Sequence, residues 1–507
     1  MIKEQEQQIN KITTAKGAKQ LILLGSFLSF FAILWYLVPL GIFPDSGSYI
    51  AMQNGREPLY PMFLAFFRRV FHEGDTLEWL AASGQLDSEK GWHFLNKWPA
   101  LHVSTFLQSL LAGYGCYRLF VSVRKVFHTK LFLSILVGLA TLIPYVLTPL
   151  ASASGMMLNK AVLTEGLAFP FYYLFIAALI RGVFADQAAE RDGQDGKTFL
   201  GEKVRAYALA LFYALLLVLT RNQMLVALGL WCLCMLWEIV CAKTGKGRIL
   251  TVALLLVCVF GFFGLRSGAN EIYNRNVHAG YRGTDTGSYN LLTTAIYLTN
   301  PDDITKIEDV RLQALFQKMY NEADTRKLTS AYAGSGLLTR AYHYEDCYDA
   351  IGLEIQQPIL FGDAADRGVS DDDALNEVVR EANAMVHALA PALFGRYIVN
   401  YVCTCASGFT RSIAASGTML GFAALVFYAA AIILTALRLK KDRKDPRAWF
   451  MVFALAAIVV NVCATSLMIM CLSRYMIYNI ALFYIAGAVL VFGRKERKPS
   501  PSGDAPE

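Results

Sequence analysis

Residues 21–49 read LILLGSFLSFFAILWYLVPLGIFPDSGSY, an apolar run that ends abruptly at an aspartate. About 20 apolar residues in a helix are enough to cross the hydrocarbon core of a bilayer. The run from Leu21 to Phe43 meets that length, and no small-residue cleavage pattern follows it, so we expect a membrane span and no cleavable signal peptide. Asp45 then lies at the mouth of this helix, where a charge is costly unless it serves a function.

The composition of the whole chain also indicates a membrane protein. Of its 507 residues, 55% are hydrophobic and only 17% are charged. Aromatic residues make up 13%, which suits bilayer interfaces. The net charge of +7 is explained by Lys and Arg in cytoplasmic loops, so we expect no nucleic-acid partner. All but Cys347 of the ten cysteines lie in or beside apolar segments, which argues against a disulfide framework.

Ten apolar runs predict ten membrane spans. They are 21–43, 99–121, 131–150, 161–182, 206–221, 223–241, 249–267, 416–437, 449–470 and 475–493. With the N-terminus in the cytoplasm, Lys and Arg concentrate in the inner loops and are rare in the short outer turns, as the positive-inside rule requires. We therefore expect an all-α, multi-pass integral membrane protein, which we place in a bacterial plasma membrane.

The spans divide the chain into three predicted regions. Residues 1–267 form an N-terminal transmembrane module with a first outer loop at 44–98, 268–415 an extracytoplasmic domain, and 416–507 the C-terminal spans with a basic cytoplasmic tail. The stretch 387–407 is apolar but contains Arg396. If it crossed the membrane, the last basic clusters would move outside, so we predict an interfacial or re-entrant helix there. The tail from Pro499 is expected to be disordered.

The first outer loop is predicted to contain two juxtamembrane helices. In 58–71, apolar side chains recur at helical spacing beside Arg68 and Arg69, the pattern of an amphipathic helix lying in the membrane surface. A second short helix is expected at about 76–96. These helices either cover a cavity that is open to lipid and water, or they only close the outer end of the bundle.

Several short motifs recur at matching positions of a known superfamily. They are PDSGSY at 44–49, REPLYP at 56–61, LQSLL at 107–111 with YRLF at 117–120, LTEGLA at 163–168, LTRNQ at 219–223 and the pair Arg474-Tyr475. Together they resemble the GT-C superfamily of membrane glycosyltransferases, in particular the protein O-mannosyltransferases and the aminoarabinose transferases. The resemblance covers roughly the first 240 residues and the last two spans. Asn222 stands where that family has proline, and 268–385 matches nothing in it.

The resemblance implies a polyprenyl-phosphate sugar as donor and transfer on the outer face to a lipid, a cell-envelope polymer or a protein. Such a reaction needs a base for the acceptor hydroxyl and cations for the departing phosphate. By position Asp45 is the best base, although it could instead cap the helix that follows. Glu165 is a second acid that could orient the acceptor, bind a cation or share the base role; otherwise it complements its helix dipole. Nothing indicates the close carboxylate pair of a retaining enzyme, so single-displacement inversion is the simplest scheme.

The cations for the phosphate are expected from the outer face. Lys160, Arg221 and Arg474 are the only Lys and Arg in the short outer turns, and Arg56 lies in the first outer loop. Arginine would bind phosphate oxygens bidentately and lysine as a point charge. The alternative is that they extend to lipid headgroups, which we favour for Lys160 and Arg56 and also for Arg396 and Arg411. Four further residues are predicted to shape the first loop: Tyr49, Glu57, Pro58 and Tyr60.

Other features of the sequence are weaker. The stretch 342–347 has no recognised metal spacing, and Asp371 to Asp373 lack the pattern of a calcium loop. We predict no metal site, while a divalent cation stays open as a cofactor. Two alternatives to the transferase also stay open: a flippase or other transporter of lipid-linked glycan, and a polysaccharide polymerase or ligase that uses a diphosphate donor. A transporter often has internal repeats and charges at the membrane midplane, and neither is evident.

Overall fold

The computed structural model describes residues 2–53, 55–74, 77, 89–151, 157–186, 196–242, 244–277, 287–414 and 418–493. Over these residues the protein is helical and contains no strand, apart from one isolated parallel bridge between Gly41 and Ala161. The prediction of an all-α protein is confirmed for this part of the chain.

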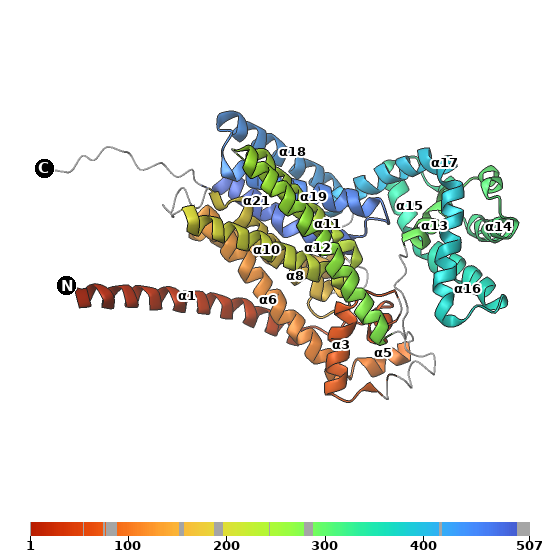
Figure 1. Cartoon of the computed structure of the whole chain (residues 1–507), viewed down its shortest axis with the longest axis horizontal. Helices are drawn as coiled ribbons and strands as arrows, with labels where there is room; N and C mark the ends of the chain where they lie inside the picture. Colours follow the sequence, from red (N-terminus) through yellow and green to blue (C-terminus); the bar gives the residue numbers. More distant parts are fainter. Residues whose placement is uncertain are drawn as a thin grey trace.

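The helices form a long bundle with a smaller helical domain at one end (Figure 1). The bundle contains α1 (Ile2–Leu37), α6 (Pro99–Phe127), α7 (Leu131–Ala151), α8 (Thr164–Val183), α10 (Gly196–Thr220), α11 (Leu225–Cys241), α12 (Gly245–Val277), α18 (Thr418–Lys441), α19 (Pro446–Ser466), α20 (Ser473–Met476) and α21 (Ile480–Phe492). Short helices in the loop after α1 are α2 (Ser46–Ile50), α3 (Leu59–Val70) and α5 (Glu89–Leu95). The smaller domain contains α13 (Gly287–Leu298), α14 (Val310–Thr325), α15 (Leu337–Asp349), α16 (Gln357–Asp366) and α17 (Asp371–Arg411). Single turns of other helix types are η1 (Asn222–Met224), η2 (Pro301–Lys306), η3 (Ser330–Tyr332), η4 (Ala350–Gln356) and η5 (Ile477–Asn479).

Nine helical stretches among the described residues are long and apolar enough to cross a membrane. They are Gly17–Leu37, Leu131–Thr148, Thr164–Val183, Leu200–Thr220, Asn222–Cys241, Gly245–Val277, Gly421–Lys441, Pro446–Ser466 and Ser473–Phe492. Each coincides with a predicted span, which supports a multi-pass membrane protein. The predicted tenth span, 99–121, is the exception. It falls within α6, whose polar residues, Gln108 and Arg118 among them, make it less apolar than the nine, although it packs between α1, α7 and α8.

Helix α8 lies at the centre of the bundle, and its neighbours pack closely against it. Nearly all its side chains are buried, and α6 and α10 pack along it. On α6, a Cβ at Gly115 would lie 3.1 Å from the Pro170 carbonyl oxygen of α8, while one at Gly113 would lie 3.0 Å from the Phe27 carbonyl oxygen of α1. Small residues at these two positions therefore let α6 contact both helices, as is common in membrane bundles.

The smaller domain has a hydrophobic core of its own, built by α13 to α16 and the first part of α17. Helix α17 has 41 residues and contacts both this domain and α18 and α19 of the bundle. The helix predicted at 387–407 is the second half of α17, which is continuous through Pro391, and its interfacial or re-entrant position stays a prediction. The start of α1 and the end of α21 lie at the end of the bundle opposite this domain (Figure 1).

The loop after α1 follows its predicted secondary structure in part. The helix predicted at 58–71 is α3, which buries Tyr60, Leu64 and Phe67 and exposes Phe66 on its other side. Of the helix predicted at 76–96, the described part is α5; most of the remainder lies outside the described residues, as does the tail from Pro499. All ten cysteines are free, as predicted.

Candidate functional site

The loop after α1 is held against the start of α8, and this fixes the position of Asp45. The amide of Gly41 donates to the Lys160 carbonyl (3.1 Å), and the amide of Val162 donates to the Gly41 carbonyl (2.8 Å). The buried Ser46 hydroxyl donates to the Val162 carbonyl (2.8 Å). A Cβ at Gly41 would lie 2.9 Å from the Phe43 ring, so a larger residue there would displace that ring. As a result Asp45 and Glu165, far apart in the sequence, belong to one site.

The Asp45 side chain does not cap the helix that follows it. It makes no capping hydrogen bond to α2, although Asp45 occupies the N-cap position. Its Oδ1 accepts a hydrogen bond from Arg56 Nη2 (3.1 Å), and its Oδ2 accepts one from Arg474 Nη1 (3.4 Å). The side chain is 37% exposed. The capping alternative is therefore wrong, and Asp45 is a carboxylate between two arginines that remains open to solvent.

Glu165 lies deeper in the same site, with a side chain only 2% exposed. Its Oε1 forms an ion pair with Arg221 and lies 3.9 Å from Arg474 Nε, and its Oε2 accepts from the Thr164 hydroxyl (3.1 Å). The guanidinium groups of Arg221 and Arg474 both lie over the Tyr475 ring, at 4.5 and 5.0 Å from its centroid. Such cation–π contacts add to the ion pairs in holding guanidinium groups in place. Arg474 thus joins the exposed Asp45 to the buried Glu165.

A polar chain fixes the wall of the site beside these charges. The Tyr60 hydroxyl donates to Gln108 Oε1 (3.2 Å), and Gln108 Nε2 donates to the Ala161 carbonyl (3.2 Å). A Cβ at Gly166 would lie 2.2 Å from Gln108 Nε2, so glycine is required for this approach. The Tyr49 ring packs edge-on against Tyr60. Two of the four loop residues chosen from the sequence therefore connect the first loop to α6 and α8.

Arg56 is oriented by Tyr49. Its guanidinium lies 4.6 Å from the Tyr49 ring centroid and donates from Nη1 to the Tyr49 hydroxyl (3.3 Å). Burial raises the pKa of the Tyr49 hydroxyl above its ordinary value, so it stays protonated near neutral pH.

Glu57 ties the loop to the bundle, and Pro58 precedes the helix α3 of that loop. Glu57 Oε1 lies 3.5 Å from Arg266 Nη2 of α12, which also donates to Asn222 Oδ1 (3.0 Å). Burial raises the pKa of Glu57, and the Arg266 guanidinium opposes that shift. Pro58 is the residue that precedes the first turn of α3. Neither residue is among the hydrogen-bond or ion-pair partners of the Asp45 side chain, which are Arg56 and Arg474.

Lys160 does not join the other cations. Its Nζ donates to the carbonyls of Trp35 (2.6 Å) and Val38 (2.7 Å), and it lies 4.3 Å from the Trp35 ring centroid. The last carbonyls of a helix lack partners within it, so this ammonium completes the end of α1. We leave Lys160 out of the phosphate-binding group for that reason.

One residue near the site had no signal in the sequence. Asp349, at the end of α15 in the smaller domain, interacts electrostatically with Arg474 and Asp45. Burial raises its pKa, Arg474 opposes the shift, and Asp45 adds to it.

Arg411 also joins this domain to the bundle, through an ion pair with Glu345 (2.6 Å) and a hydrogen bond to the Cys471 carbonyl (2.8 Å).

The donor set does not resemble a metal site. Among the described residues no group of three or more His, Cys, Asp or Glu side chains could hold a metal ion. Asp45 and Glu165 both face arginines instead. What the arrangement offers chemically is a solvent-accessible carboxylate beside guanidinium groups, which suits proton removal next to a phosphate.

Comparisons with known proteins add no relative to this picture. No protein-family model, curated protein or solved structure matches the chain.

Proposed function

We propose that this chain is a membrane glycosyltransferase of the GT-C type, which moves a sugar from a polyprenyl-phosphate donor to an acceptor hydroxyl on the extracytoplasmic face. One observation carries the proposal: Arg474 joins a solvent-accessible carboxylate, Asp45, to a buried one, Glu165. The exposed acid can meet a substrate, while the buried acid can fix the cations beside it. The motifs around both acids resemble those of the superfamily.

In the proposed reaction Asp45 is the general base. As the acceptor oxygen bonds to the anomeric carbon, its proton passes to the Asp45 carboxylate. The bond from that carbon to the donor phosphate breaks on the opposite side, and the electron pair leaves with the polyprenyl phosphate. The configuration at the sugar carbon is inverted in this single step.

Arg56, Arg221 and Arg474 supply the positive charge for the departing phosphate. Three arginines and two carboxylates leave one net positive charge within the group. Glu165 keeps Arg221 and Arg474 in place by its ion pairs. A preorganised cation costs little reorganisation when the phosphate charge develops, which is the general basis of electrostatic catalysis. In this proposal the membrane lipids and the polyprenyl chain of the donor contact the helices around the site.

The direct test is mass spectrometry of lipids and glycans from cells with and without the gene, complemented by wild type or by Asp45→Asn. We expect one glycan to disappear without the gene and to return only with the wild type. If purified protein moves lipid-linked sugar across liposomes but transfers none to any acceptor, the chain is a transporter. A diphosphate rather than a monophosphate product would identify the polymerase or ligase variant.

A further inference from the structure

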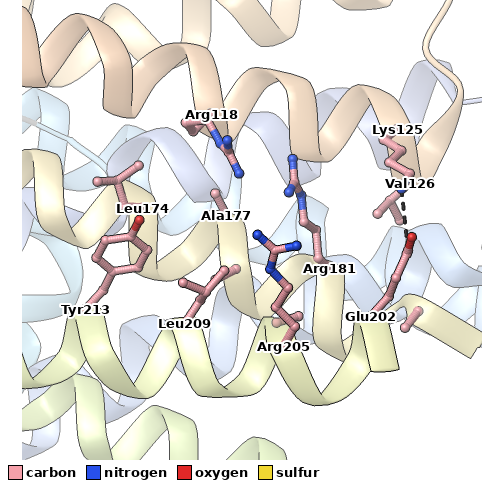
Figure 2. Close-up of a pocket in the computed structure, with 13 residues that line it drawn as sticks. Arg118, Lys125, Val126, Leu174, Ala177, Arg181, Glu202, Arg205, Leu209 and Tyr213 are labelled. Atoms are coloured by element: carbon pink, nitrogen blue, oxygen red, sulfur yellow. Dashed lines mark ion pairs between the residues drawn. The ribbon is translucent and has the colours of Figure 1, made fainter. Parts of the chain in front are cut away.

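We propose that a second pocket, between α6, α8 and α10, binds a phosphate group, carried either by an anionic lipid or by a soluble phosphate ester. The cavity has a volume of about 350 Å³, within the range of small-ligand sites. Its lining combines basic and apolar side chains (Figure 2). We call it the basic pocket, defined by Arg118, Lys125, Arg181, Glu202, Arg205 and Tyr213 with the apolar residues between them.

Three arginines from three different helices point into this pocket. Arg118 comes from α6, Arg181 from α8 and Arg205 from α10, and Figure 2 shows their guanidinium groups turned toward one another. Like charges at such a position repel one another and favour a bound anion. Guanidinium groups also match phosphate oxygens in a bidentate geometry.

No carboxylate of the described residues forms an ion pair with these three arginines. Arg118 donates to the Tyr114 hydroxyl (3.3 Å), and Arg181 donates from Nε to the Ser122 hydroxyl (2.9 Å). The one acid in the lining, Glu202, pairs with Lys125 at 3.6 Å. The Ser122 contact fixes the direction of the Arg181 guanidinium and uses only one of its five donors. Their remaining N–H groups can therefore bind an anion.

The pocket wall indicates what could accompany the phosphate. Leu174, Ala177 and Leu209 form an apolar surface beside the arginines, and Tyr213 lies at the same edge (Figure 2). A phosphate with an apolar body, such as a phospholipid, would contact both surfaces. A small soluble phosphate would use the arginines alone. Both sources share one recognised group, so the experiment must separate them.

The basic pocket is separate from the site of Asp45 and Glu165. On α8, Arg181 follows Glu165 by sixteen residues, and Arg205 of α10 precedes Arg221, the residue directly after that helix, by the same number. At 1.5 Å per residue each pair is about 24 Å apart along its helix. The positive-inside rule assigns the end with the basic pocket to the cytoplasm. The inference does not depend on the proposed transferase activity.

The test is ligand binding to the purified full-length protein in neutral detergent. The probes are dioctanoyl phosphatidylglycerol, inorganic phosphate and, as a zwitterionic control, dioctanoyl phosphatidylcholine, each measured by native mass spectrometry and thermal shift. We expect phosphatidylglycerol or phosphate to bind the wild type at least about tenfold more strongly than the Arg118→Gln/Arg181→Gln double variant. Arg124→Gln, an exposed arginine of α6 outside the pocket lining, is the matched control and should bind like the wild type.

Each outcome is decisive. Phosphatidylglycerol binding without phosphate binding identifies a lipid source, and phosphate binding alone identifies a soluble source. Equal loss in Arg124→Gln, or binding of neither probe, overturns the proposal and leaves a basic membrane-facing surface. If the double variant does not fold, Arg205→Gln replaces it, because that exposed side chain has no ion pair with a described acid whose loss would disturb folding. These binding results do not depend on glycan transfer, so they stand even if no transferase activity is found.

Discussion

Two groups of arginines lie at opposite ends of α8 and α10, and they differ in what faces them. Arg56, Arg221 and Arg474 face the carboxylates of Asp45 and Glu165. In the basic pocket, Arg118 and Arg181 face hydroxyl groups, and the acid present pairs with Lys125. The same residue type therefore serves as a fixed cation at one end of the bundle and, at the other, as a cation without an ion pair to any carboxylate of the described residues.

The difference lies in the carboxylates and their depth. Glu165 is buried and holds two arginines, so their positions are set before any ligand arrives. A buried charge is tolerated only with such partners. The basic pocket is more open, and water can screen its arginines until an anion binds. We therefore expect substitution of Glu165 to affect stability, substitutions of Asp45 and Arg474 to affect chemistry, and those in the basic pocket to affect binding alone.

The largest expected effect is on catalysis, from Asp45→Asn. Removing the proposed base should lower kcat by about 10²- to 10⁴-fold, with the native donor and acceptor. The exposed ion pairs of Asp45 are worth at most about 1 kcal/mol, so thermal stability and membrane insertion should stay near wild type. Asp366→Asn, an exposed acid of α16, is the matched control. Near-normal turnover by folded Asp45→Asn would remove the base assignment.

The next effect is on stability, from Glu165→Gln. This change leaves Arg221 without its buried partner, and breaking such a pair costs about 3–5 kcal/mol. Thermal unfolding in detergent should show a clear loss of stability, partly restored in Glu165→Gln/Arg221→Gln. Glu202→Gln at the basic pocket is the comparison, because its pair with Lys125 is exposed and should contribute at most about 1 kcal/mol. Equal losses at the two ends would contradict the distinction between them.

A smaller effect is expected on donor use, from Arg474→Ala. The loss of one proposed phosphate ligand should raise the donor KM or lower kcat by about 10- to 100-fold. Acceptor selectivity should not change, since Arg474 is assigned to the donor. Steady-state kinetics with a series of acceptors checks both points, and Arg275→Ala on the exposed face of α12 is the control. Unchanged kinetics would take Arg474 out of the donor site.

The sequence predicted the membrane helices better than it predicted their partners. Nine spans follow from run length and hydropathy alone, because each contains an 18-residue stretch of high mean hydropathy with few charged residues. Helix α6 was counted as a span by the same rule, yet it carries Gln108 and Arg118 on faces that contact other helices. Helix α17 was predicted only in part, because its first half is amphipathic toward the smaller domain.

For the candidate site, the sequence predicted which residues lie at the same ends of the helices, but not how their side chains pair. Asp45, Glu165, Arg221 and Arg474 were expected at the same helix ends, and the structure brings them together. Which acid pairs with which arginine depends on side-chain directions that spacing does not give. Asp349 comes from another domain and has no local motif. Arg118, Arg181 and Arg205 each satisfied the positive-inside rule, so nothing in the sequence indicated that they converge.

The smallest effect is expected from substitution of Lys160. This residue differs from both groups of arginines, because its positive charge is hydrogen-bonded to backbone carbonyl groups. Lys160→Met removes the hydrogen bonds to Trp35 and Val38, so we expect a loss of about 1–3 kcal/mol of stability. The donor KM should not change, in contrast to Arg474→Ala. Lys130→Met, an exposed lysine at the start of α7, is the control for loss of a positive charge. A raised donor KM in Lys160→Met would return Lys160 to the phosphate-binding group.

The pH dependence of the same variant provides an independent check. Burial lowers the pKa of Lys160 below its ordinary value of 10.5, so the folded protein binds that proton less tightly than the unfolded chain does. The contribution of Lys160 to stability is then fully present above pH 10.5 and is lost as the pH falls through the lowered folded-state pKa. The stability difference between wild type and Lys160→Met should therefore grow as the pH rises from about 8 toward 10.5. A difference that shrinks over this range would mean that the folded protein binds the Lys160 proton more tightly than the unfolded chain does, so that the carbonyl groups at the end of α1 outweigh the effect of burial.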